Sequence, residues 1–178
     1  MAIAAAAFAL YRSTLLPGLD FGDTASFQAA VGDFDLSPRQ GYPLYYALAN
    51  LTAWIVGGEP AHALNLLSAI CGALACGVLV WVASGLTGSL LAGAGGGLLL
   101  ASSYTFWTQA IIAEVYTLHL LFTGLVLAAL LWWERRRTLA RLAAVFALLR
   151  SNSSASTRAR KAGQSSRASW LASCASSA

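Results

Sequence analysis

The chain has 178 residues, of which 58% are hydrophobic and 10% are charged, and its formal net charge is +4. Because soluble domains usually carry about 25% charged residues, this composition excludes an ordinary soluble domain and predicts an integral membrane protein. The basic residues are concentrated after Trp133, which is typical of a topology signal or a polar tail and argues against a nucleic-acid partner.

The first predicted element is the apolar segment over residues 1–18, "MAIAAAAFALYRSTLLPG". It lacks the basic residues that precede the apolar core of a signal peptide, so a first membrane span is favoured over a cleaved leader. Within such a span, Arg12 would extend toward the lipid headgroups or face neighbouring protein.

An acidic cluster follows this segment. Four of the seven acidic residues of the chain lie close together, namely Asp20, Asp23, Asp33 and Asp35. A carboxylate held at the membrane surface in a partly desolvated pocket can act as a general base on a hydroxyl, and Asp23 is the candidate. The alternative is that Asp20 and Asp23 are solvated loop acids, or that Asp23 caps a helix starting at Thr24.

The segment "LSPRQGYPLYYAL", residues 36–48, predicts a rigid turn that leads into an aromatic-rich helix over residues 42–57. This helix is too short to cross a bilayer, so it is expected to lie at the membrane interface or to re-enter the membrane. Arg39 is the only basic residue between positions 20 and 60. It is therefore the natural partner for a phosphate group, with an ordinary surface arginine as the competing interpretation.

Three further spans are predicted over residues 63–83, 89–107 and 115–133. The middle one contains a glycine cluster that lowers helix propensity but lets helices approach closely in a bilayer. Cys71 and Cys76 lie inside the first of these spans, and their spacing argues for small apolar filler rather than a disulfide or a zinc site.

Glu114 is the only charged side chain between Pro60 and Trp133. A carboxylate at the edge of a span is costly to bury, which makes it a functional candidate. The alternative is an acid that interacts favourably with the positive end of the following helix. His119 is expected to be a packed or hydrogen-bonded side chain rather than a metal ligand, and the sequence leaves a divalent metal open.

The arginines of "ERRRTLAR", residues 134–141, predict which side of the membrane each connection faces. Clustered arginine is retained in the cytoplasm. Counting back through the predicted spans, residues 104–114 and 20–60 are extracytoplasmic. Asp20, Asp23 and Glu114 are therefore expected in the same compartment.

Residues 138–149 read as the start of a fifth span, which stops at Arg150. Residues 150–178 are rich in Ser, Ala and Arg, and such a composition cannot bury enough apolar surface to fold. The sequence thus predicts a transmembrane part over 1–149 and a disordered tail over 150–178. The tail is either the mark of a fragment or shifted reading frame, or a natural basic tail near anionic lipid.

Three blocks in order carry a family resemblance: "LLPGLDFGDTASFQAAV", "GYPLYYALANL" and "FWTQAIIAEVYTLHLLFTGLVLAALLWWERRR". Over residues 3–149 the chain resembles the amino-terminal part of the membrane family catalogued as domain of unknown function 2723. That family is related to the protein O-mannosyltransferases of the GT-C glycosyltransferase superfamily. The resemblance implies an all-α membrane protein with about four transmembrane helices plus an interfacial helix, as part of a GT-C fold.

The resemblance also implies an activity, the transfer of a sugar from a polyprenyl-phosphate donor to a hydroxyl acceptor. Asp23 matches the aspartate that serves as base in the family motif, with Glu114 as its companion, whereas Ser26 stands where the motif has Glu. Donor or substrate binding falls to four residues, Asp20, Arg39, Tyr42 and Gln109. The expected partners are the lipid bilayer, the polyprenyl-phosphate-linked sugar and the hydroxyl acceptor.

The alanine- and arginine-rich composition looks bacterial, so the expected location is a bacterial inner membrane. Two other functions stay open. Glu114 and glycine-interrupted spans also suit a transporter or channel subunit. The short length suits a non-catalytic partner in a membrane assembly.

Overall fold

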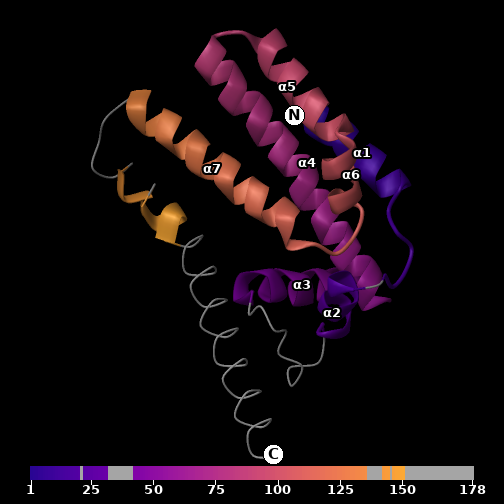
Figure 1. Cartoon of the computed structure of the whole chain (residues 1–178). Helices are drawn as coiled ribbons and strands as arrows, with labels where there is room; N and C mark the ends of the chain where they lie inside the picture. Colours follow the sequence, from indigo (N-terminus) through magenta and orange to yellow (C-terminus); the bar gives the residue numbers. More distant parts are fainter. Residues whose placement is uncertain (21, 32–41, 136–141, 145, 151–178) are drawn as a thin grey trace, which may run out of the picture.

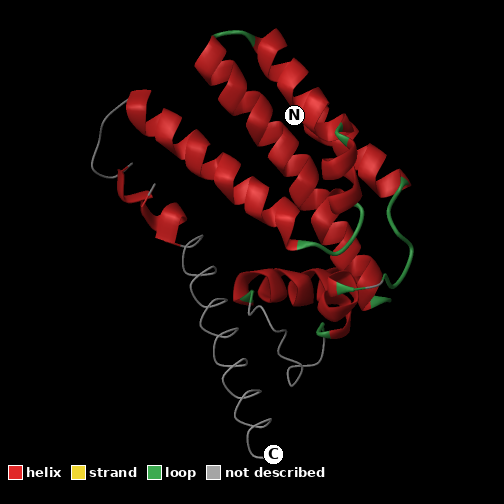
Figure 2. Cartoon of the chain, viewed as in Figure 1, coloured by secondary structure: helices red, strands yellow, loops and turns green. Residues whose placement is uncertain are grey.

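The structure is a computed structural model that describes residues 1–20, 22–31, 42–135, 142–144 and 146–150. Within these ranges the ordered elements are helices and no strand is present, which confirms the all-α prediction for this part (Figure 2). In chain order, the helices are α1 (Ala2–Ser13), α2 (Asp23–Ala29), α3 (Pro43–Val56), α4 (Pro60–Thr87), α5 (Leu90–Ser102), α6 (Tyr104–Ala110) and α7 (Val115–Arg135).

Helix α4 is the centre of the molecule, and α1, α5 and α7 pack along it (Figure 1). Its 28 residues make it about 42 Å long, more than the roughly 30 Å of a bilayer core. Thirteen of its residues are buried, which explains why its sequence is apolar on nearly every face.

The contacts along α4 fix the direction of each neighbour. Ala4 of α1 meets Gly77 of α4, while Tyr11, further along α1, reaches back to Gly72, so α1 runs antiparallel to α4. Helix α7 instead starts beside the first half of α4 and runs the same way, since its Gly124 lies against Val78. The end of α1 and the start of α7 therefore point toward the end of the molecule at which α4 starts, and α2 and α3 lie at that end (Figure 1). We call this the α2–α3 end.

Two glycines explain why α5 can approach α4 so closely. A Cβ atom on Gly93 would overlap the side chain of Ser84, and one on Gly97 would overlap the side chain of Val80. A Cβ on Gly95 or Gly96 would meet nothing within 4 Å. Half of the glycine cluster is thus a packing surface of the kind that small residues form between membrane helices.

The prediction of four spans needs correction. Only α4 and α7 are long and apolar enough to cross a membrane within the described ranges. The helices in the other two expected positions, α1 with 12 residues and α5 with 13, are about 18–20 Å long. The expected span over 89–107 is interrupted because the backbone of Ser103 is extended, with ψ of 122°, and this residue separates α5 from α6.

Helix α3 matches the aromatic-rich helix expected over residues 42–57, and it lies across the α2–α3 end of the bundle (Figure 1). Its position relative to a membrane stays a prediction. Arg136, Arg137, Arg141 and the tail over 151–178 lie outside the described residues, and the side chain of Arg135 is undescribed. In the expected fifth span over 138–149, residues 142–144 and 146–149 are helical, whereas 138–141 and 145 lie outside the described residues.

Candidate functional site

Glu114 lies directly before α7, and α4 holds its backbone in place. The backbone N–H of Glu114 donates to Oγ of Ser68 over 3.1 Å, and the same hydroxyl donates to the carbonyl oxygen of Glu114 over 3.3 Å. Ser68 is buried, with 1% of its surface exposed. This two-way contact fixes where the Glu114 side chain begins.

The carboxylate of Glu114 is held from the other connection. The hydroxyl of Thr24 donates to Oε1 of Glu114 over 3.1 Å. Thr24 is buried and is the second residue of α2, whose first residue is Asp23. The backbone of Asp23 is thus adjacent to a residue that contacts Glu114. The side chain of Asp23 lies outside the described part of the structure.

Helix α2 starts where it does because the chain turns sharply just before it. Gly22 has a φ of 73°, in the left-handed region that glycine adopts at little cost, and it precedes the first helical residue, Asp23. The turn places the positive end of a helix at Asp23, where a carboxylate is electrostatically favoured.

Two buried amides anchor the connection between α1 and α2. Nδ2 of Asn65 donates to the carbonyl oxygen of Leu16 over 2.9 Å, and its Oδ1 accepts from Nε2 of Gln28 over 3.1 Å. Oε1 of Gln28 in turn accepts from the backbone N–H of Asp20 over 3.1 Å. Asn65 and Gln28 are buried, so these bonds are formed away from water and fix the path of the chain toward Asp23.

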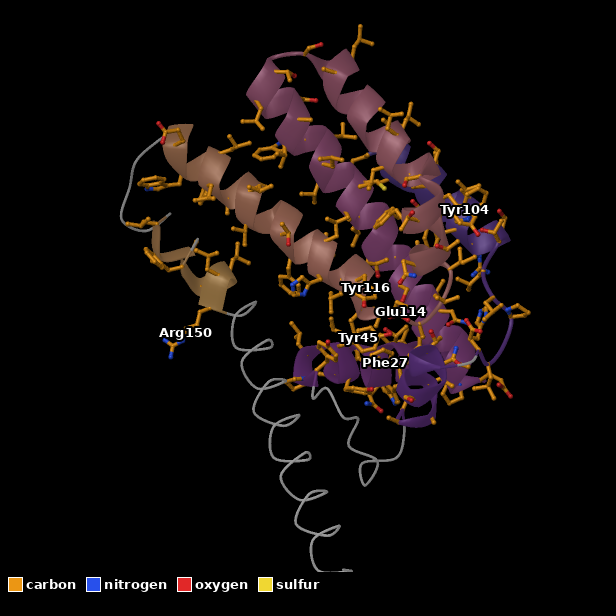
Figure 3. The ribbon with its side chains drawn as sticks, in the orientation of Figure 1. Phe27, Tyr45, Tyr104, Glu114, Tyr116 and Arg150 are labelled. Carbon is orange, nitrogen blue, oxygen red and sulfur yellow. The ribbon has the colours of Figure 1, made fainter. Side chains whose placement is uncertain are left out.

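Aromatic rings join α2 to α3. The ring of Phe27 makes edge contacts with Tyr45 and Tyr42, at centroid distances of 5.5 and 6.1 Å. Figure 3 shows Phe27 and Tyr45 beside Glu114 at the α2–α3 end. Burial raises the pKa of Tyr45, the hydroxyl of Ser68 lowers it, and the charge of Glu114 raises it, with a net shift upward. The phenol is therefore neutral at physiological pH.

The remaining predicted site residues are placed as follows. Tyr42 directly precedes α3 and packs against Phe27. Gln109 is in α6, and its Oε1 is buried without a hydrogen-bond partner among the described residues. The structure gives no hydrogen bond from Gln109 to Glu114 within those ranges, and Arg39 lies outside them. The roles assigned to all six residues stay predictions.

For three further side chains the sequence predicts a structural role. Cys71 and Cys76 are free and buried in α4, as expected of apolar filler. His119 is exposed on α7, so the expectation of a packed side chain needs correction. The described ranges contain no group of three or more His, Cys, Asp or Glu side chains that could hold a metal ion.

Sequence reasoning missed four residues that position this site: Thr24, Gln28, Asn65 and Ser68. A signal was present for two of them. Asn65 and Ser68 are polar residues in the apolar run of α4, and their spacing puts them on the same face of a helix. Chemically, the site presents a carboxylate that accepts a hydrogen bond from the hydroxyl of Thr24, and a carboxylate has further acceptor positions for the hydroxyl of an alcohol.

Comparison with known proteins places this geometry in context. Residues 23–152 match the family described as "Protein O-mannosyl-transferase TMEM260 N-terminal domain". The chain is similar to "Protein O-mannosyl-transferase TMEM260" of Mus musculus, with 33% identity over 139 residues, 75% of this chain and 19% of that protein. It thus spans about a fifth of the length of this relative. No solved structure matches significantly.

Proposed function

The chain belongs to the family of the protein O-mannosyl-transferase TMEM260 N-terminal domain, and from this membership we propose that it is the amino-terminal membrane part of a glycosyltransferase. The proposed reaction transfers a sugar, mannose by analogy with the relative's name, from a polyprenyl-phosphate donor to a hydroxyl group of a protein. The proposal includes the finer relationships expected from the sequence, to domain of unknown function 2723 and to the GT-C superfamily.

In the proposed chemistry, the carboxylate of Asp23 takes the proton of the acceptor hydroxyl. The acceptor oxygen attacks the anomeric carbon of the sugar and forms the new glycosidic bond. The bond between that carbon and the phosphate oxygen breaks, and polyprenyl phosphate leaves with the electron pair. A general base in this position typically contributes about 10²–10⁴-fold to the rate.

One observation carries this assignment, the hydrogen bond from Thr24 to Glu114. It brings the connection that contains Asp23 together with the one that contains Glu114. Glu114 then acts as the companion acid that binds and orients the acceptor. Its backbone is already fixed by Ser68, so little freedom is lost when a substrate binds.

Donor binding is proposed for Asp20, Arg39, Tyr42 and Gln109. The guanidinium of Arg39 would pair with the phosphate, because a planar fork of donors matches phosphate oxygens. Oε1 of Gln109, which is buried without a hydrogen-bond partner among the described residues, would accept a hydrogen bond from a sugar hydroxyl.

The proposed site faces the extracytoplasmic side of a bacterial inner membrane. The α2–α3 end lies opposite the end of α7, which leads into the arginine cluster at residues 134–141 (Figure 1). Since clustered arginine favours the cytoplasm, the α2–α3 end is placed outside.

The test is transfer of mannose from a polyprenyl-phosphate donor to a threonine-containing peptide by membranes that contain the protein. Because the chain covers 19% of its relative, the substitutions are made both in this chain and at the aligned positions of the full-length relative. Asp23→Asn should lower the transfer rate by about 10²-fold or more. The matched control is Glu59→Gln, an exposed acid at the same end of the molecule. Unchanged transfer by the Asp23 variant would remove Asp23 as the base.

A further inference from the structure

Two buried hydroxyl groups near Glu114, those of Tyr45 and Thr117, make no hydrogen bond of good geometry with the described residues. Tyr45 is 2% exposed and Thr117 is 0% exposed, and for Tyr45 the hydroxyl of Ser68 is near enough to lower its pKa. A buried polar group without a partner destabilises the folded state, so native proteins seldom keep one without a reason. Helical threonines commonly bond to a carbonyl one turn earlier, and Thr117 does not use that option.

Tyr45 and Thr117 both lie beside the same stretch of α4. Tyr45 packs in one core with Cys71 of α4 and with Ala113, the residue before Glu114. Thr117 is on the turn of α7 that follows Glu114. Helix α7 runs parallel to α4, and Gly124 of α7 lies against Val78 of α4. Thr117 and Cys71 each lie two helical turns before these contacting residues, so they are level with one another.

The surrounding groups are suited to binding an alcohol. Tyr45 lies near both Ser68 and Glu114, since the hydroxyl of Ser68 lowers its pKa through a side-chain contact and the charge of Glu114 raises it. As a neutral phenol it can donate a hydrogen bond, and the hydroxyl of Thr117 can do the same. The carboxylate of Glu114, which is half-buried, is the matching acceptor.

We propose that the hydroxyls of Tyr45 and Thr117, together with the carboxylate of Glu114, form a subsite for one alcohol group of a substrate. The bound hydroxyl donates to Glu114 and accepts from Tyr45 or Thr117. The alcohol is either the side-chain hydroxyl of the acceptor protein or a hydroxyl of the sugar. This subsite deepens the proposed transferase function and rests on it for the identity of the substrate.

The test uses binding to the whole 178-residue chain in detergent micelles, so its outcome does not depend on catalysis. The probes are a peptide with a single threonine and methyl mannoside, each titrated while the thermal midpoint Tm is followed. A peptide in which valine replaces the threonine shows whether the hydroxyl is what binds. The probe that shifts Tm identifies the source of the alcohol.

The variants are Tyr45→Phe and Thr117→Val, which keep the shape of the side chain and remove only the hydroxyl. Without probe, we expect Tm to stay the same or rise, because an unpartnered hydroxyl is removed. We expect the dissociation constant of the probe to rise about three- to tenfold in each variant, because one hydrogen bond to the probe is lost. Tyr46→Phe is the matched control, since that hydroxyl is also buried and unpartnered but belongs to the neighbouring residue of α3.

Three results would overturn the proposal. The first is binding to the Tyr45 and Thr117 variants as tight as to the wild type. The second is the absence of saturable binding of either probe to the wild type. The third is a large fall in the Tm of a variant without probe, which would mean that the removed hydroxyl bonds to another group of the protein. Saturable, hydroxyl-dependent binding without any mannose transfer would instead contradict only the proposed function.

Discussion

The hydroxyl of Thr24 donates a hydrogen bond of 3.1 Å to the carboxylate of Glu114, and this bond joins the start of α2 to the start of α7. The two residues are 90 positions apart in the chain. Because this bond joins the two connections of the proposed site, it is the first contact to test.

Removing the Thr24 hydroxyl should destabilise the protein through its loss of contact with Glu114. In a double-mutant cycle of Thr24→Val and Glu114→Ala, we expect a coupling free energy of about 1.5 kcal/mol. That is the low end for a hydrogen bond to a charged group, because Glu114 is only half-buried. Unfolding in detergent micelles measures it, and Thr24→Ser is the control that keeps the bond. A coupling near zero would mean that the two side chains do not interact.

The sequence identified Glu114 and missed the residues that hold it, for a physical reason. A lone charge in a long apolar run stands out because its burial is costly. Ser68 and Asn65 are neutral and small enough to pass as ordinary residues of a span. Their partners, Glu114 and Gln28, are 46 and 37 positions away, so only the fold reveals the contacts.

Asn65 should be essential for the path of the chain between α1 and α2. Asn65→Leu keeps the approximate volume but leaves the carbonyl of Leu16 and the amide of Gln28 without their partner. We expect a loss of about 2 kcal/mol or more in the free energy of unfolding and faster hydrogen exchange over residues 16–20. Thr52→Val, which removes a hydroxyl bonded only within α3, should change stability by less than about 0.5 kcal/mol. Exchange at the wild-type rate in the Asn65 variant would show that this segment is anchored in another way.

The extent of the helices was predictable only in part. The positions of α4 and α7 follow from long apolar runs, which few other structures can accommodate. The end of α5 did not follow, because serine is tolerated within membrane helices and only the extended backbone at Ser103 marks the break. The glycine cluster predicted close packing, but the sequence does not show which of the glycines face α4.

That distinction among the glycines gives a paired prediction. In Gly93→Ala the added Cβ would overlap Ser84 and lie 2.6 Å from the carbonyl oxygen of Val80, so we expect a loss of about 1–3 kcal/mol. In Gly96→Ala the Cβ meets nothing within 4 Å, and alanine favours a helix, so we expect a gain of about 0.5–1 kcal/mol. Thermal unfolding of both variants in one detergent provides the comparison. Equal effects of the two substitutions would argue against α5 packing on α4 through Gly93.

The proposed site requires that the connection after α1 and the one before α7 face the same side of the membrane, outside the cell. The direct measurement is labelling of intact cells with a membrane-impermeant maleimide, in a chain whose own cysteines are replaced. Single cysteines are placed at Leu19, in the connection after α1, at Thr108, in α6 shortly before the connection to α7, and at Leu86, near the opposite end of α4. We predict that the cysteines at Leu19 and Thr108 react in intact cells and that the one at Leu86 reacts only after permeabilisation. Labelling that puts Leu19 and Thr108 on opposite sides of the bilayer would contradict the shared site.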